Sequence, residues 1–124
     1  MAAESRKRRR LKHLEPVCIL LQYTGMIDLG KIQGFEWDAG NARKNQDKHD
    51  VSQAEAEQIF FNDPLLLLAD QRHSATELRY HALGQTEDGR RLLIAFTLRQ
   101  DGRFIRVISA RDMNRRERTI YDTA

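Results

Sequence analysis

The sequence predicts an α+β fold, with a small antiparallel sheet, two helices before most of its strands and one helix after them. Helix-capping patterns fall within residues 38–63, strand-like apolar runs separated by Asp-Gly turns fill residues 65–110, and an Arg-rich helical segment follows. Because helices and strands are grouped along the chain instead of alternating, the order β-α-α-β-β-β-α favours α+β over α/β.

The first 26 residues differ in composition from the rest of the 124-residue chain. Residues 1–25 contain six Lys and Arg against two Glu, and their longest apolar run spans residues 17–21. A secretory signal needs an apolar stretch of about seven residues or more. We therefore expect residues 1–26 to be a basic, poorly ordered extension and residues 27–124 to form the domain.

A strand and a polar helix are predicted at the start of this domain. Residues 35–37 alternate between apolar and polar side chains, as in a short strand with one buried face. Asp38 is a suitable N-cap, because its carboxylate accepts the free amides of the following turn, so a helix is expected over residues 39–48. The stripe expected to face the core consists of Ala39, Ala42, Gln46 and His49, with Asn45 beside it.

The second helix has a stronger signature at both ends. Ser52 followed three residues later by Glu55 is a capping box, and Val51 with Ala56 can form a hydrophobic staple. The Asn-Asp-Pro sequence at 62–64 is a stop signal for the helix.

The remainder predicts strands joined by tight turns. Strands are expected over residues 78–83, 90–99 and 104–110, after a brief apolar run at 65–69. Five consecutive apolar residues in the second of these strands indicate a central position, buried on both faces. The Asp-Gly pairs between strands supply the positive φ angles of tight turns. Asp112 is expected to cap a last helix over residues 114–121.

Charge is distributed unevenly along the chain. Residues 35–88 hold five basic and 11 acidic residues, whereas residues 89–124 hold nine basic and four acidic residues. This asymmetry could place a basic patch on one face of the domain. The single cysteine, Cys18, allows no intrachain disulfide and favours a reducing compartment.

Metal, cofactor and membrane binding are not predicted. The histidines, which are His13, His49, His73 and His81, do not have the spacing of metal ligands, and no phosphate-binding glycine motif occurs. We therefore expect no metal and no cofactor. The longest apolar runs have five residues, far fewer than the about twenty of a membrane helix.

Four polar clusters are candidates for chemistry, and each also has an ordinary structural explanation. They are the Lys48-His49 pair, Arg79 beside Glu77, Ser109 with Arg111, and the helix that carries Arg115, Arg116 and Arg118. Cations are common at helix C-termini, and the other clusters would be a surface ion pair, an arginine bound to a carboxylate at a strand end, and a solvated helix face. Simple alternation in the last strand places Ile105, Val107, Ser109 and Arg111 on one face.

Together these clusters resemble a known family. The segments concerned are FEWD (35–38), Asn45 with Lys48-His49, residues 51–64, residues 77–79 with the glycine after their strand, ISAR (108–111), and RRER (115–118) with Tyr121. In this order they resemble the BrnT toxins, the ribonuclease halves of type II toxin–antitoxin pairs, whose fold is similar to that of the RelE toxins. Two positions depart from the family pattern: Ala39-Gly40 replaces a common proline, and Asp50 replaces a glycine. Asp50 is still expected to end its helix in the left-handed conformation.

The resemblance implies an endoribonuclease that inhibits translation and arrests growth without a metal. In such a reaction a ribose 2′-OH attacks the adjacent phosphate, which yields a 2′,3′-cyclic phosphate and a free 5′-OH. Proton transfer and cations near the phosphate are required. His49 is the expected titrating group, Lys48, Arg79 and Arg111 the phosphate ligands, and Ser109 orients one of them. The residues leave open which group is the acid and which the base.

The same resemblance implies the partners. A cognate BrnA-like antitoxin would cover the basic site, and RNA would be the substrate, with Arg115, Arg116 and Arg118 contacting it. Operator DNA would be bound only indirectly, through the antitoxin. No membrane partner is implied, and a cytoplasmic location is expected.

Two other functions fit the same residues. A non-catalytic module of this fold could bind RNA or a protein, and a structural adaptor could use the charge asymmetry to oligomerise. Expression of the protein alone separates these possibilities, since only a ribonuclease toxin halts growth. Substitution of His49 should have little effect on a pure binding module.

Overall fold

The computed structural model describes residues 27–70 and 77–124. The predicted extension over residues 1–26 and most of the polar loop before the third strand lie outside the described residues. The helices are the 3-10 turns η1 (Leu29–Lys31) and η2 (Ile59–Phe61) and the α-helices α3 (Ala39–His49), α4 (Gln53–Gln58) and α5 (Arg115–Asp122). The strands are β1 (Gly34–Glu36), β2 (Leu66–Ala69), β3 (Tyr80–Gln85), β4 (Arg91–Arg99) and β5 (Phe104–Asp112). The predicted α+β class is confirmed.

The sheet has the strand order β1-β5-β4-β3-β2. Strands β3 to β5 form the predicted antiparallel meander, β2 extends it by pairing with β3, and β1 pairs with β5 in parallel. The predicted order has no strand at the brief apolar run after Pro64, but this run forms the edge strand β2. The predicted central strand is β4, in which residues 92–97 are all buried.

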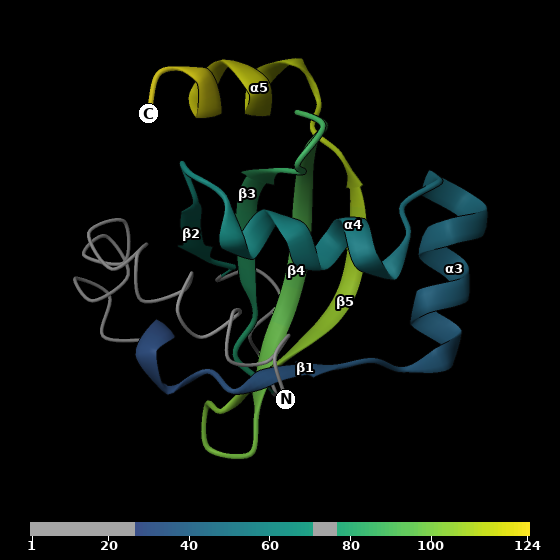
Figure 1. The fold of residues 1–124 in the computed structure, drawn as a ribbon, viewed down its shortest axis with the longest axis vertical. Coiled ribbons are helices and arrows are strands. Elements are labelled where there is room, and N and C mark those ends of the chain that lie inside the picture. Colours follow the sequence, from purple (N-terminus) through teal and green to yellow (C-terminus); the bar gives the residue numbers. More distant parts are fainter. Residues whose placement is uncertain (1–26, 71–76) are drawn as a thin grey trace.

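The helices are placed on different sides of this sheet (Figure 1). Helix α4 crosses the front face, α3 stands beside β5, and α5 lies across the end of the sheet where β5 finishes. The main core lies under α4 and η2 and includes Ile59, Phe60, Ile94, Phe96 and Val107. A smaller cluster on the opposite face packs against α5 and consists of Leu83, Leu93, Met113 and Tyr121, with Leu66 beside them.

The predicted start of the strand at 78–83 and the predicted cap of the last helix are wrong. Strand β3 begins only at Tyr80, so Arg79 precedes it, and Leu78, the first residue of the predicted strand, is 52% exposed. Asp112 does not cap the last helix, because it belongs to β5; Asn114 is the N-cap and forms a capping box with Glu117.

The polar helix α3 faces the core differently from the prediction. Ala39 and Gln46, assigned to the inward stripe, are exposed, and Asn45 is the buried residue of the helix. Asp38 caps the helix as predicted, and Asp50 ends it in the left-handed conformation at φ 53°. The carboxamide Oδ1 of Asn45 accepts a hydrogen bond from the backbone N–H of Ala110 at 3.2 Å. Strand β1 pairs only with residues 104–106 of β5, so this amide replaces a strand partner farther along β5.

A β-bulge in β5 changes which side chains share a face. Phe96 is paired with Val107 and Ala95 with Ser109, so Ile108 is the extra residue. Paired residues of antiparallel strands point to the same side, and Ala95 and Phe96 point to opposite sides. Val107 is therefore in the core, whereas Ser109 and Arg111 lie on the opposite face. The predicted common face for these residues is wrong because simple alternation does not continue through a bulge.

Replacing Gly84 by alanine is expected to lower the free energy of unfolding by about 2 kcal/mol, within the usual cost of overpacking a core. A Cβ at this position of β3 would lie 2.8 Å from the Cβ of Ile59 and 3.1 Å from its carbonyl oxygen. Gly34→Ala is the matched control, since its Cβ would meet Phe104 at an ordinary 3.5 Å. Urea denaturation of both variants tests the difference, and equal stabilities would contradict the close packing of β3 on η2.

Candidate functional site

Arg111 stands at the end of β5, where α5 begins. Its Nη1 and Nη2 donate to the two carboxylate oxygens of Glu117 at 2.8 and 2.9 Å, and Nη1 also donates to the carbonyl of Asp112 at 3.0 Å. The hydrogen bonds with Arg111 hold the pKa of Glu117 below its ordinary range, and the same contact raises the pKa of Arg111. Because described residues engage three of its five N–H groups, two donors of the guanidinium are left without a partner in this part of the chain.

The face of the sheet that carries Arg111 also carries a histidine. Pairing aligns His81 of β3 with Ala95 of β4, and Ala95 with Ser109 of β5. These three residues form one row across the sheet, and Arg111 is in the next row, paired with Leu93. The bulge thus places Ser109 and Arg111 on the same side as His81.

His81 is held by a buried carboxylate. Its Nε2 lies 3.2 Å from Oδ2 of Asp70, and the side chain of Asp70 is 8% exposed whereas that of His81 is 34% exposed. Asp70 directly follows β2, and its backbone N–H donates to the carbonyl of Arg79 at 2.8 Å. The half-exposed imidazole is therefore anchored on one side and accessible on the other.

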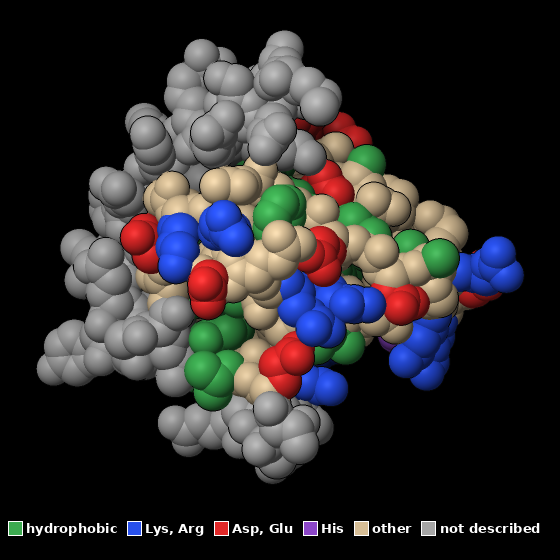
Figure 2. Space-filling model, turned by 90° about the horizontal axis from the view of Figure 1, so that it is seen from below, with side chains coloured by type: hydrophobic (Ala, Val, Ile, Leu, Met, Phe, Trp, Pro, Cys, Tyr) green, Lys and Arg blue, Asp and Glu red, His purple; other side chains and the backbone are tan. Residues whose placement is uncertain are grey.

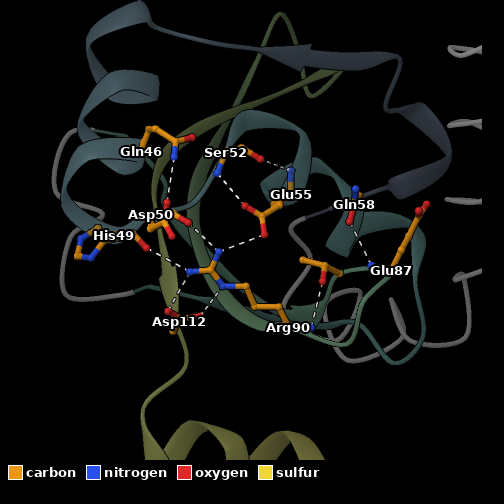
Figure 3. Close-up of polar contacts among 10 residues, drawn as sticks. Gln46, His49, Asp50, Ser52, Glu55, Gln58, Glu87, Arg90 and Asp112 are labelled. Carbon is orange, nitrogen blue, oxygen red and sulfur yellow. Dashed lines mark hydrogen bonds and ion pairs between the residues drawn. The ribbon is translucent and has the colours of Figure 1, made fainter.

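The predicted Lys48-His49 pair is at the C-terminus of α3, where Lys48 is exposed and His49 half-buried. In Figure 3 the backbone carbonyl of His49 points toward the guanidinium of Arg90, which donates to it at 3.2 Å. The same guanidinium binds the carbonyl of Asp50 at 2.7 Å. Arg90 comes from the turn before β4, so it fixes the end of α3 to the sheet.

Two carboxylates complete the Arg90 network (Figure 3). Asp112 accepts two hydrogen bonds at 2.7 and 3.0 Å, and Glu55, the capping-box residue of α4, accepts one at 3.1 Å. The contact with Arg90 holds the pKa of Asp112 below its ordinary range, with His49 and Arg118 adding smaller effects of the same sign. His49 and Arg118 therefore lie within electrostatic reach of one carboxylate at the end of β5.

The predicted site residues consequently fall into two groups around the end of β5. Arg111 and Asp112 are neighbours in a strand, so their side chains point to opposite faces. Ser109 and Arg111 share one face with His81, and the end of α3 with Lys48 and His49 approaches the other side through Arg90. Arg79, half-buried, precedes β3.

The arginines of helix α5 and of the residues before it differ in exposure and in their contacts. Arg115 and Arg116 are exposed, and Arg118 donates to the carbonyl of Met113 at 2.7 Å. Five other arginines within residues 89–124 are paired with carboxylates: Arg90, Arg91, Arg99, Arg106 and Arg111. Figure 2, which shows the opposite end of the molecule, has basic and acidic side chains intermixed. Much of the positive charge predicted for residues 89–124 is thus neutralised locally.

Three residues of this arrangement were missed in the sequence. His81 could have been found from its position two residues after Arg79 in the strand predicted over residues 78–83, which is the spacing of a shared face. Asp70 and Arg90 carry no comparable signal, because their partners are distant in sequence. The contact of Arg90 with the carbonyl of His49, for example, spans 41 residues.

The family of the chain follows from comparison with known proteins. Residues 37–117 match the family model of the ribonuclease toxin BrnT of type II toxin–antitoxin systems. This match spans more than half of the sequence and includes both residue groups. The chain belongs to the BrnT toxin family.

A solved structure has the same fold. The ribonuclease toxin BrnT of Brucella abortus, known from a 1.1 Å crystal structure, aligns with a TM-score of 0.50 and 18% sequence identity, covering 66% of this chain and 97% of that protein. No curated protein matches the sequence. As a BrnT toxin of a type II system, the chain has an antitoxin as its partner. Among the described residues, no helix has the length and apolar character to cross a membrane.

Proposed function

We propose that this BrnT toxin is an endoribonuclease that cleaves RNA without a metal, inhibits translation and thereby arrests growth. Family membership supports the ribonuclease class. The observation that carries the proposal is the position of Arg111 at the end of β5, 37% exposed beside Ser109 and with two donors that no other described residue engages. A guanidinium of this kind can bind a phosphate by two parallel hydrogen bonds.

In the proposed reaction the ribose 2′-oxygen attacks phosphorus, and the bond from phosphorus to the 5′-oxygen breaks. The products are a 2′,3′-cyclic phosphate and a 5′-OH. Arg111, Arg79 and Lys48 stabilise the charge that develops on the phosphate, and Ser109 orients one of these groups. His49 is the proposed proton-transfer residue of this set, because an imidazole changes its protonation near neutral pH.

RNA is proposed to reach this region over α5. Arg115 and Arg116 are exposed on that helix, and with Arg118 they would bind the phosphate backbone without base specificity. A BrnA-like antitoxin would cover the same surface, and operator DNA would be bound through the antitoxin. The reaction is proposed to take place in the cytoplasm.

Alanine substitutions test this proposal. Arg111→Ala and His49→Ala should each reduce RNA cleavage by about 100-fold or more, since loss of one phosphate-stabilising or proton-transfer group has effects of this order. Both should also abolish growth arrest when the toxin is expressed alone. Cleavage of purified messenger RNA is the measurement, and mass spectrometry of the fragments checks for cyclic phosphate ends.

The matched control for Arg111 is Arg91→Ala, which removes an exposed arginine paired with Asp122 at 3.2 Å. Its cleavage rate should remain near that of the wild type. Full activity of Arg111→Ala or His49→Ala would remove that residue from the mechanism. If the wild type binds RNA but leaves it intact, the protein is a binding module and the ribonuclease proposal is wrong.

A further inference from the structure

We infer that His81, positioned by Asp70, is a second proton-transfer residue of the toxin, acting on the face of the sheet that carries Ser109 and Arg111. This inference rests on the proposed ribonuclease function and adds to it a residue that the sequence did not single out. Three observations support the inference: the pairing of β3, β4 and β5, the bulge in β5, and the contact between the side chains of His81 and Asp70.

The contact of Asp70 with His81 has the geometry of an oriented imidazole. A carboxylate that is 8% exposed lies 3.2 Å from Nε2, and the ring itself is 34% exposed. A buried carboxylate in this position fixes the ring and balances the positive charge that forms when the other ring nitrogen accepts a proton. Nδ1 is the atom left to meet a substrate.

Phosphate-binding groups lie on the same face. His81 and Ser109 are separated by one strand, β4, which contributes the small side chain of Ala95 between them. With strands spaced by about 4.8 Å, the two residues are about 10 Å apart, a span that a phosphodiester with its two sugars can bridge. Arg111 stands in the next row, and Glu117 on α5 lies within electrostatic reach of His81.

The bulge makes this arrangement possible. Without the extra residue Ile108, Ser109 and Arg111 would continue the alternation of Ile105 and Val107 and point into the core. Bulges commonly re-aim side chains next to active sites. His49 approaches the end of β5 from the side of Arg90 and Asp112. Of the two described histidines, His81 is therefore the one that shares a face with both Ser109 and Arg111.

In the inferred step, Nδ1 of neutral His81 accepts the proton of the ribose 2′-OH. The 2′-oxygen forms its bond to phosphorus, and the 5′-oxygen leaves and takes a proton from His49, the proton-transfer residue of the proposed function, which regains a proton from solvent. The imidazolium of His81 then returns its proton to solvent. Arg111 neutralises part of the charge on the non-bridging oxygens during this step.

Single-turnover cleavage of a messenger RNA transcript, measured between pH 5 and pH 8, tests the inference. His81→Gln should lower the rate by about 100-fold and remove the rise of rate with pH that a neutral imidazole produces. Asp70→Asn should lower the rate by about tenfold and change the shape of the pH profile, which a purely structural role would not do. Among the described residues, Asp70 contacts His81, Glu117 lies within electrostatic reach of it, and Arg111 lies in the next row of the same face, so these charged groups affect the profile.

Thr97→Val is the matched control on the same face. Thr97 is buried, and its hydroxyl has no hydrogen-bond partner within the described part of the chain, so this variant should cleave at the wild-type rate. Thermal unfolding establishes that each variant is folded; if His81→Gln is not, His81→Asn and Asp70→Asn replace it.

The outcomes separate the inference from the proposed function. A wild-type rate and pH profile for His81→Gln, together with an inactive Arg111→Ala, would overturn the role of His81 and leave the ribonuclease proposal intact. Absence of cleavage by the wild type would overturn both.

Discussion

Replacing Asn45 by alanine is expected to lower the free energy of unfolding by about 3 kcal/mol, because it leaves a buried backbone N–H without a partner and opens a small cavity. Asn45 is 1% exposed, and its Oδ1 is the acceptor for the N–H of Ala110. Urea denaturation followed by circular dichroism measures the change.

The large effect expected for Asn45→Ala arises because strand β1 (Gly34–Glu36) is short. Beyond residues 104–106, no strand of the described residues pairs with the outer edge of β5, and α3 with Asn45 takes that place. Gln46→Ala is the matched control, since this neighbouring amide is exposed and donates a hydrogen bond to the exposed carboxylate of Asp50. Its effect should be below about 0.5 kcal/mol. Similar stabilities of the two variants would show that the amide of Asn45 does not support β5.

The same substitution should also affect cleavage, because Lys48 and His49 follow Asn45 by one helical turn. Where Asn45→Ala remains folded, α3 loses its fixed position along β5. We expect the RNA cleavage rate to fall more than the folded fraction explains, which a comparison of activity with the folded fraction at one temperature measures. A fall in strict proportion to the folded fraction would assign Asn45 to stability alone.

The fold was predictable wherever local chemistry decides it. Capping patterns located α3 and α4, and the Asp-Gly turns located the strands around β4, because these signals depend on residues a few positions apart. The left-handed end of α3 at Asp50 followed in the same way. The bulge at Ile108 could not be predicted in this way, because it depends on how β4 and β5 pair and no sequence pattern indicates it.

The candidate site was predictable only in part, for the same reason. The residues that bear charge could be named from the sequence, but the face on which Ser109 and Arg111 lie depends on the bulge. The carboxylate partner of His81 is Asp70, 11 residues earlier in the sequence, and Arg90 contacts partners that are 22 to 41 residues away. Such contacts are set by tertiary structure and leave no periodic pattern in the sequence.

Arg90→Met is the second substitution with a large expected effect, a loss of about 3 kcal/mol in the free energy of unfolding at pH 7. The guanidinium donates to two backbone carbonyls at the end of α3 and to Glu55, and charge-assisted hydrogen bonds of this kind contribute about 1.5–3 kcal/mol each before solvent screening. The bond to Asp112 adds less, because that carboxylate is 59% exposed. Arg91→Met, which removes one exposed ion pair next to it, should cost below about 1 kcal/mol.

The effect of Arg90→Met should also depend on pH. Arg90 holds the pKa of Asp112 below its ordinary 3.8, and Ser52 with Arg90 holds that of Glu55 below 4.5. A depressed folded-state pKa adds stability above the ordinary value, and this stability is lost as pH falls through the folded value. The wild type should therefore lose stability faster than Arg90→Met as pH falls below about 4.5. Urea midpoints of the wild type and of Arg90→Met, measured at pH 7 and pH 3, test this expectation. If the difference between the two midpoints is the same at both pH values, these carboxylates do not depend on Arg90 for their charge.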